Sequence, residues 1–97
     1  MEFRKPTRLM LAGVAAVVML LDSITTWLAV RAGAVELNPV VAFFLVNIQA
    51  YIAFTLFKTT AGALLTYYLV ADKQTLYAWL LIILIFIRAI AINITNL

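Results

Sequence analysis

The sequence contains no cysteine and no histidine, and charged residues make up only 11% of its 97 residues. Without cysteine the chain has no disulfide, no thiolate metal ligand and no thiol nucleophile. Without histidine it lacks the commonest metal ligand and general base. Hydrophobic residues make up 67% of the chain, whereas soluble domains average roughly 45–50%, and a soluble fold this short has too little interior to bury such an excess. These features exclude a soluble enzyme, a secreted module and a disordered tail, and they predict an integral membrane protein whose main partner is the lipid bilayer.

The chain is basic, with a formal net charge of +3 and a sequence pI of about 9.6. Its seven cations are scattered among apolar segments and form no continuous basic face of the kind that binds nucleic acid. We therefore expect no nucleic-acid partner.

Long apolar segments predict an all-α membrane protein that forms a single domain over residues 1–97. We expect three transmembrane helices, at about 9–31, 50–71 and 76–94. At a rise of 1.5 Å per residue, helices of this length cross a hydrocarbon core of about 30 Å. A cleaved signal peptide is the competing interpretation of the first segment, since residues 32–34 imitate a small-residue cleavage site. That segment is longer than a typical signal sequence and contains Asp22.

Between the first two spans we expect one short helix, at about 39–48. Asn38 is a favourable N-cap, and Pro39 fits the first helical position because its missing N–H is not needed there. A single helix over 40–71 would be about 48 Å long, too long for a simple span, and Asn47 marks its weakest point. The sequence leaves open whether the short helix re-enters the membrane, lies at its surface or continues into the next span.

The distribution of cations predicts the orientation of the chain in the cell membrane. Four basic residues fall on one side of the predicted spans, namely Arg4, Lys5, Arg8 and Lys73. Only Arg31 falls in the loop on the other side. Because short cytoplasmic loops are enriched in lysine and arginine, we expect a multi-pass protein with a cytoplasmic N-terminus and an external C-terminus.

Three charged residues lie inside the predicted spans, namely Asp22, Lys58 and Arg88. A charge there costs at least about 2.5–3.5 kcal/mol. Counting helical rise from the ends of the spans puts all three roughly 10–12 Å below the external surface. Glu36 lies in the loop just above this layer. We expect these side chains to pair with one another or to line a cavity.

Thr25 and Thr26 share a helical face with Asp22, because residues three and four apart are neighbours on a helix. The candidate intramembrane polar site therefore comprises Asp22, Thr25, Thr26, Glu36, Asn38, Lys58 and Arg88. Simpler roles are also open for these residues. The charges would form a purely structural ion-pair network, Arg88 would extend to the interface, and the threonines would bond their own helix carbonyls.

The order of these residues resembles a widespread family of small prokaryotic integral membrane proteins of unknown function. That family is defined by a D-x-x-T-T, E-x-N-P and K pattern. The matching residues are Asp22, Thr25, Thr26, Glu36, Asn38, Pro39 and Lys58. The resemblance runs from about residue 20 to residue 60. It implies that Asp22, Glu36, Asn38, Pro39 and Lys58 are signature residues and leaves Arg88 outside the pattern, but it implies no activity.

Three functions are compatible with the sequence. The first is a transporter-like or channel-like protein for a small ion or an anionic solute, which would require a homo-oligomer because three spans are too few to enclose a pathway. The second is a structural or accessory protein. The third is an intramembrane enzyme acting on a lipid-linked substrate, although the chain offers no nucleophile–base pair. A metal held by Asp22 and Glu36 would have only two carboxylates, so we expect no metal and no cofactor.

Overall fold

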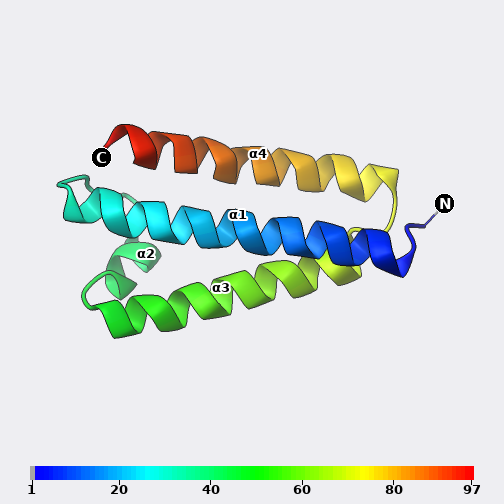
Figure 1. Ribbon diagram of the computed structural model, residues 1–97, viewed down its shortest axis with the longest axis horizontal. Helices are drawn as coiled ribbons and strands as arrows, with labels where there is room; N and C mark the ends of the chain where they lie inside the picture. The colour runs from blue at the N-terminus through cyan, green and yellow to red at the C-terminus, as the bar shows by residue number, and fades with distance from the viewer. Residues whose placement is uncertain (1) are drawn as a thin grey trace.

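Three long helices and one short helix form the molecule in a computed structural model, which describes residues 2–97 (Figure 1). They are α1 (Lys5–Arg31), α2 (Pro39–Phe44), α3 (Ile48–Leu69) and α4 (Lys73–Thr95). Helices α1 and α4 run in the same direction and α3 runs opposite to them (Figure 1). The three long helices are long and apolar enough to cross a membrane. The expected all-α architecture, with three candidate spans and one short helix, is confirmed.

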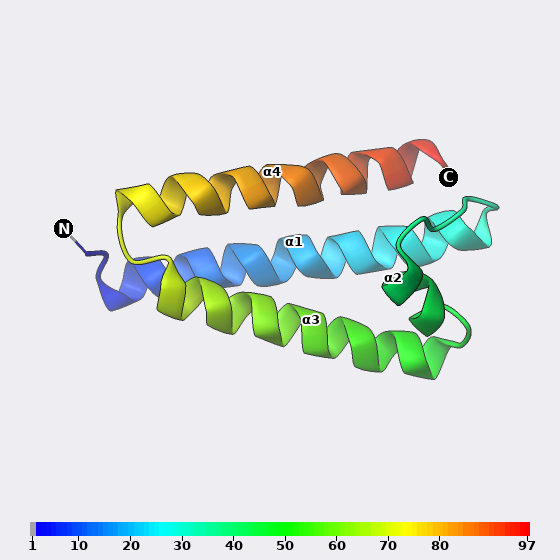
Figure 2. The same ribbon diagram turned by 180° about the vertical axis from the view of Figure 1, so that it is seen from behind.

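Helix α1 is the centre of the molecule and packs against both α3 and α4, which have little contact with each other (Figures 1 and 2). The buried core is small and lies where the three long helices meet; its members are Leu11, Ala15, Val70, Trp79 and Ile83. Within this core region Trp79 Nε1 donates a hydrogen bond of 3.1 Å to Thr66 Oγ1, which joins α4 to α3. Elsewhere α3 and α4 each pack on α1 and are connected to each other mainly through it.

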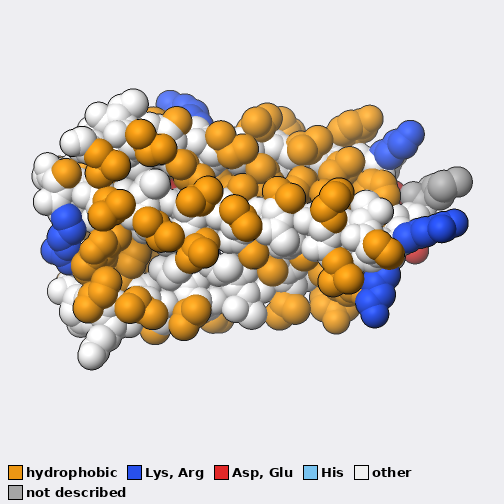
Figure 3. Space-filling model, viewed as in Figure 1, with side chains coloured by type: hydrophobic (Ala, Val, Ile, Leu, Met, Phe, Trp, Pro, Cys, Tyr) orange, Lys and Arg blue, Asp and Glu red, His pale blue; other side chains and the backbone are white. Residues whose placement is uncertain are grey.

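The two ends of the molecule differ in charge and in connections. The N-terminus and the turn between α3 and α4 lie at one end, which we call the basic end after Arg4, Lys5, Arg8 and Lys73. The loop at 32–38, α2 and the C-terminus lie at the other end, which we call the loop end (Figure 1). Hydrophobic side chains cover most of the length between them on the face shown in Figure 3. This surface suits contact with lipid along the helices.

Local capping explains where the helices begin. Helix α1 begins at Lys5, earlier than expected, because Pro6 is favourable in a first helical turn. Helix α4 begins at Lys73 rather than near 76. There, Asp72 accepts a hydrogen bond of 3.0 Å from the Thr75 backbone N–H, and the Thr75 hydroxyl accepts one of 3.0 Å from the Asp72 N–H. This reciprocal capping box satisfies backbone donors that would otherwise lack partners.

The segment before α3 forms a separate helix, as expected, but a shorter one. Asn38 accepts a hydrogen bond of 3.0 Å from the Val40 N–H and caps α2, which has six residues and ends at Phe44. Asn47 accepts one of 2.7 Å from the Ala50 N–H and caps α3. The chain is therefore broken between the two helices, and α2 does not continue into α3. At about 9 Å long, α2 is too short to cross a membrane.

A hydrogen bond from the last residue of α1 fixes the loop end against this helix. Helix α1 is followed by Gly33, whose φ of +111° favours glycine. The Arg31 guanidinium lies 4.0 Å from the centre of the Trp27 ring, and its Nη2 donates a hydrogen bond of 3.4 Å to the Leu45 carbonyl. The turn that links α2 to α3 is thereby held close to the end of α1.

Candidate functional site

A cavity of about 400 Å³ lies at the loop end, between α3 and α4, with α1 as its floor and the 34–38 loop as its cover. We call it the polar pocket. Its polar lining residues come from α1, the loop, α3 and α4, and they are Asp22, Thr26, Glu36, Asn38, Tyr51, Lys58, Asn93 and Asn96. The cavity exists because α3 and α4 diverge from each other at this end and contact α1 instead.

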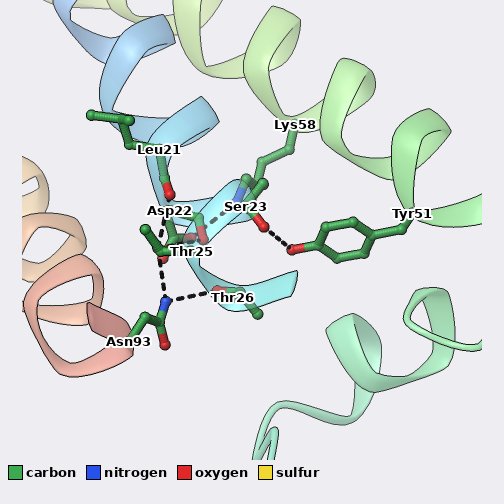
Figure 4. A network of polar contacts seen from close by, with 8 residues as sticks. All are labelled: Leu21, Asp22, Ser23, Thr25, Thr26, Tyr51, Lys58 and Asn93. Atoms are coloured by element: carbon green, nitrogen blue, oxygen red, sulfur yellow. Dashed lines mark hydrogen bonds and ion pairs between the residues drawn. The ribbon is translucent and has the colours of Figure 1, made fainter. Parts of the chain in front are cut away.

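The principal interaction in the polar pocket is a direct ion pair between two helices. Lys58 Nζ on α3 lies 3.0 Å from Asp22 Oδ2 on α1 (Figure 4). The Lys58 side chain is 20% exposed and the Asp22 side chain 15% exposed, so both remain accessible from the pocket. Lys58 Nζ also lies 5.7 Å and 5.9 Å from the ring centres of Phe54 and Phe86. The pair is direct, but it borders a cavity and is not sealed inside a dry core.

Asn93 connects α4 to α1 beside this ion pair. Its Nδ2 donates hydrogen bonds of 3.1 Å to Thr25 Oγ1 and 2.9 Å to Thr26 Oγ1 (Figure 4). Thr25 Oγ1 in turn donates to the Leu21 carbonyl at 2.8 Å. The prediction that a threonine would bond its own helix carbonyl is confirmed at Thr25. The two threonines also have a second role, because they accept the bonds that hold the outer part of α4.

Tyr51 connects α3 to α1 on the other side of the pocket. Its hydroxyl donates a hydrogen bond of 2.7 Å to the Ser23 carbonyl, and its ring lies beside Trp27 at 5.2 Å between centres. Tyr51 is only 4% exposed. This buried bond fixes the first turn of α3, two turns before Lys58, relative to the Asp22 turn of α1.

Glu36 brings a second carboxylate to the polar pocket. Its Oε1 accepts a hydrogen bond of 2.9 Å from the backbone N–H of Asn38, which stiffens the loop that covers the cavity. Ion pairs in the described part of the chain join Arg8 to Glu2 and Lys58 to Asp22. Glu36 is in neither pair, so its negative charge has no cationic side chain of residues 2–97 against it.

Arg88 does not join the other predicted site residues. It is exposed, it does not line the polar pocket, and it takes part in neither ion pair formed within residues 2–97. Asn93 faces α1. Arg88 precedes it by five residues, which correspond to one full helical turn plus about 140°, so Arg88 projects well away from α1. Depth along a helix gives no information about the side on which a residue projects. The structure therefore brings together Asp22, Glu36 and Lys58 and leaves Arg88 on the outer face of α4.

The polar pocket brings together charged and hydrogen-bonding groups from four segments of the chain. Within residues 2–97, no group of three or more His, Cys, Asp or Glu side chains is arranged to hold a metal ion. The pocket offers carboxylate oxygens from Asp22 and Glu36, an ammonium from Lys58, and amide groups from Asn93 and Asn96. Such a set can bind and orient a charged or hydroxylated group.

The sequence-based site lacked Tyr51, Asn93 and Asn96, all of which line the polar pocket. A signal for the two asparagines was present, because they lie three residues apart near the end of an otherwise apolar helix. Residues at this spacing share a helical face. A signal for Tyr51 was present as well, because it lies seven residues before Lys58, two turns away on the same face of α3.

Comparison of the chain with models of protein families, curated proteins and solved structures found no match. The resemblance to a small prokaryotic membrane protein family stays a prediction based on the short motifs around Asp22, Glu36 and Lys58.

Proposed function

We propose that the protein is the subunit of an oligomeric membrane carrier or channel, and that the polar pocket binds its solute. The observation that carries this proposal is the position of the Asp22–Lys58 pair. The two side chains are in contact at 3.0 Å, yet both border a cavity of about 400 Å³. An ion pair that only joins helices needs no opening to a cavity, whereas a charged pair that recognises a solute must be within reach of that solute.

The proposed orientation places the polar pocket on the external side of the cell membrane. The basic end carries Arg4, Lys5, Arg8 and Lys73, whereas Arg31 is at the loop end. Cytoplasmic segments near spans carry an excess of lysine and arginine. The basic end would accordingly be cytoplasmic, and the pocket would open outward.

A homo-oligomer is part of the proposal because three helices do not enclose a pathway. Large hydrophobic side chains stay exposed on the outer faces of the helices, among them Leu81 at 65% and Ile85 at 68% on α4. These faces are free to meet lipid or further copies of the chain. The short helix α2, next to the pocket, is comparable to the interrupted helices that carriers use at solute sites.

The charge of the polar pocket favours a cation over an anion. Asp22 and Glu36 contribute two carboxylates, and Lys58 contributes one ammonium. The formal sum is one negative charge, and a cavity lined by one sign of charge attracts ions of the opposite sign. Of the solutes that the sequence leaves open, a small cation fits this pocket better than an anionic solute.

A structural role is the second candidate, and the 3.0 Å contact between Lys58 and Asp22 favours it. In that case the pair would only join α3 to α1, and exchanging the two charges would preserve its function. In a solute site, the exchange would preserve the attraction but would move the carboxylate away from Asn93 and Thr26. The two roles therefore differ in whether the Asp22→Lys, Lys58→Asp double variant retains activity.

The proposal is tested by uptake into proteoliposomes, with radiolabelled sodium, rubidium and methylammonium as the probes. We expect saturable uptake of at least one probe above that of empty liposomes, and a loss of tenfold or more in Asp22→Asn. Asp72→Asn is the matched control, because it makes the same chemical change at the basic end, where asparagine also caps helices well. Chemical cross-linking is used to check that both variants assemble as the wild type does.

Two results would overturn the proposal. One is uptake of every probe at the level of empty liposomes. The other is uptake by Asp22→Asn that equals uptake by Asp72→Asn. Full uptake by the charge-exchanged double variant would instead assign the pair a structural role.

A further inference from the structure

A second cavity, of about 320 Å³, lies between α3 and α4 on the side toward the basic end. We call it the apolar cavity. Its lining is almost entirely hydrophobic and includes Ala15, Met19, Gly62, Leu65, Trp79 and Ile82. Gly62 leaves space in the wall of α3 that any side chain would fill, and Met19 occupies part of that space.

The apolar cavity and the polar pocket follow the same face of α1. Ala15 and Met19 line the first, and Asp22 and Thr26 line the second. These positions are separated by four, three and four residues, which is the spacing of a single helical stripe. The floor of one cavity therefore continues into the floor of the other.

The walls continue in the same way. On α3, Gly62 lines the apolar cavity and Lys58, one turn earlier, lines the polar pocket. On α4, Ile82 and Ala89 are two turns apart and line the apolar cavity and the polar pocket respectively. Figure 2 shows α3 and α4 on either side of α1 along this whole length. The two cavities thus lie one after the other along α1, and we refer to them together as the groove, polar at the loop end and apolar toward the basic end.

We infer that the ligand of this groove is an amphiphile with a cationic amine or quaternary ammonium head and an alkyl tail. This inference rests on the proposed function and names the class of its solute. A small hydrated cation would use only the polar pocket. An amphiphile matches both halves, because its head meets carboxylates while its tail meets hydrophobic side chains.

The groups in the polar pocket suit an ammonium head in particular. Asp22 and Glu36 supply negative charge, and Lys58 repels a second cation less than the two acids together attract it. Tyr51 adds an aromatic side chain to the lining of the pocket, and aromatic faces bind quaternary ammonium groups by cation–π attraction. An anionic head would instead face two carboxylates.

The open side of the groove gives the tail a route from the bilayer. Helices α3 and α4 have little contact with each other, so a chain need not unfold the protein to pass between them. A tail gains little free energy by leaving lipid for an equally apolar cavity. Selectivity must therefore come from the head group, which makes Asp22 and Glu36 the deciding residues.

Tryptophan fluorescence tests this inference directly, because the chain has only two tryptophans, Trp27 and Trp79. In the Trp27→Phe variant, Trp79 in the wall of the apolar cavity is the single reporter. The probe is hexadecyltrimethylammonium carrying a bromine at the far end of its tail, added to the full chain in lipid nanodiscs. The matched control is hexadecanoate with the same terminal bromine, which enters the same lipid but carries an anionic head.

We expect saturable quenching of Trp79 by the brominated ammonium, at least twice that produced by the brominated carboxylate at equal membrane concentration. Unbrominated hexadecyltrimethylammonium should reverse the quenching. The additional substitution Asp22→Asn or Glu36→Gln should weaken it several-fold, while circular dichroism shows the helices intact.

Equal, unsaturable quenching by the two probes would overturn the inference, because it would report only mixing with the lipid. Asp22-dependent uptake of small cations would still support the proposed function in that case. Conversely, saturable quenching that depends on Asp22, without any uptake into proteoliposomes, would keep the amphiphile site and reject transport. The two proposals therefore fail separately.

Discussion

The Asp22–Lys58 pair should contribute measurably to stability, and its contribution can be worked out from the geometry. At the 3.0 Å that separates Lys58 Nζ from Asp22 Oδ2, Coulomb's law with an effective dielectric constant of about 20 gives roughly 5.5 kcal/mol of attraction. Each ion also gives up part of its hydration, which offsets much of this gain. Hydrogen bonds to charged groups contribute about 1.5–3 kcal/mol in net terms. We expect a coupling free energy in that range.

The measurement is a double-mutant cycle on the free energy of unfolding, in mixed micelles of a mild and a denaturing detergent. The variants are Asp22→Asn, Lys58→Met and the double variant. Lys58→Met should be the more damaging single change, because it leaves the Asp22 carboxylate without its cation. In Asp22→Asn, the amide oxygen still accepts a hydrogen bond from Lys58. The double variant should therefore lose less than the sum of the two single changes.

Additive losses would refute this reasoning. If the double variant equals the sum within about 0.5 kcal/mol, the two side chains do not interact in the folded protein. The 3.0 Å contact would then have no energetic meaning. A coupling well above 3 kcal/mol would also contradict the argument, because it would require a drier environment than exposures of 20% and 15% allow.

Three further predictions concern other parts of the molecule. Asn93→Leu removes both donors to the α1 threonines and should lower the free energy of unfolding by about 1 kcal/mol, as interhelical hydrogen bonds in membranes are weak; unchanged stability would contradict it. A Cβ at Gly62 would overlap the Met19 side chain, whose Cε would lie 2.6 Å away. Gly62→Ala should therefore cost about 1–2 kcal/mol, and should cost less when Met19→Ala is already present. The hydrogen bond from the Thr75 backbone N–H lowers the pKa of Asp72, so its cap stabilises α4 fully above an ordinary aspartate pKa of about 3.9 and loses this effect as the pH falls through the lowered value. The protection factors of the amides at the start of α4, which correct hydrogen exchange for its intrinsic pH dependence, should fall with acid in the wild type and not in Asp72→Asn.

Much of the fold could be predicted because it depends on local properties of the chain. Three apolar segments of sufficient length determine three helices in any bilayer, since each helix satisfies its own backbone hydrogen bonds. The cap at Asn38 and the break near Asn47 were also predictable, because a side chain that accepts backbone N–H bonds acts within a few residues. The ends of the helices were less predictable. The capping box at Asp72 lengthens α4 into a segment that its polar composition assigns to the turn.

The candidate site was predicted in part. Counting residues along the spans correctly predicted that Asp22 and Lys58 lie at the same depth. The position of Glu36 in the loop after α1 correctly predicted that it lies near them. Arg88 has a matching depth but lies on the outer face of α4. Asn93, which was not among the predicted site residues, reaches α1. Rise along a helix is additive and can be counted, whereas the direction of a side chain depends on which face its helix presents to its neighbours.

The sequence by itself determined a multi-span helical protein with too few charges to be soluble and with an acid and a base at matching depth. Only the tertiary structure decided that Lys58 touches Asp22, and that this contact borders a cavity. It also decided that α3 and α4 both pack on α1 and have little contact with each other. This follows from side-chain packing between helices far apart in the chain, which no local pattern encodes. The alignment of the polar pocket and the apolar cavity along α1 follows from that arrangement.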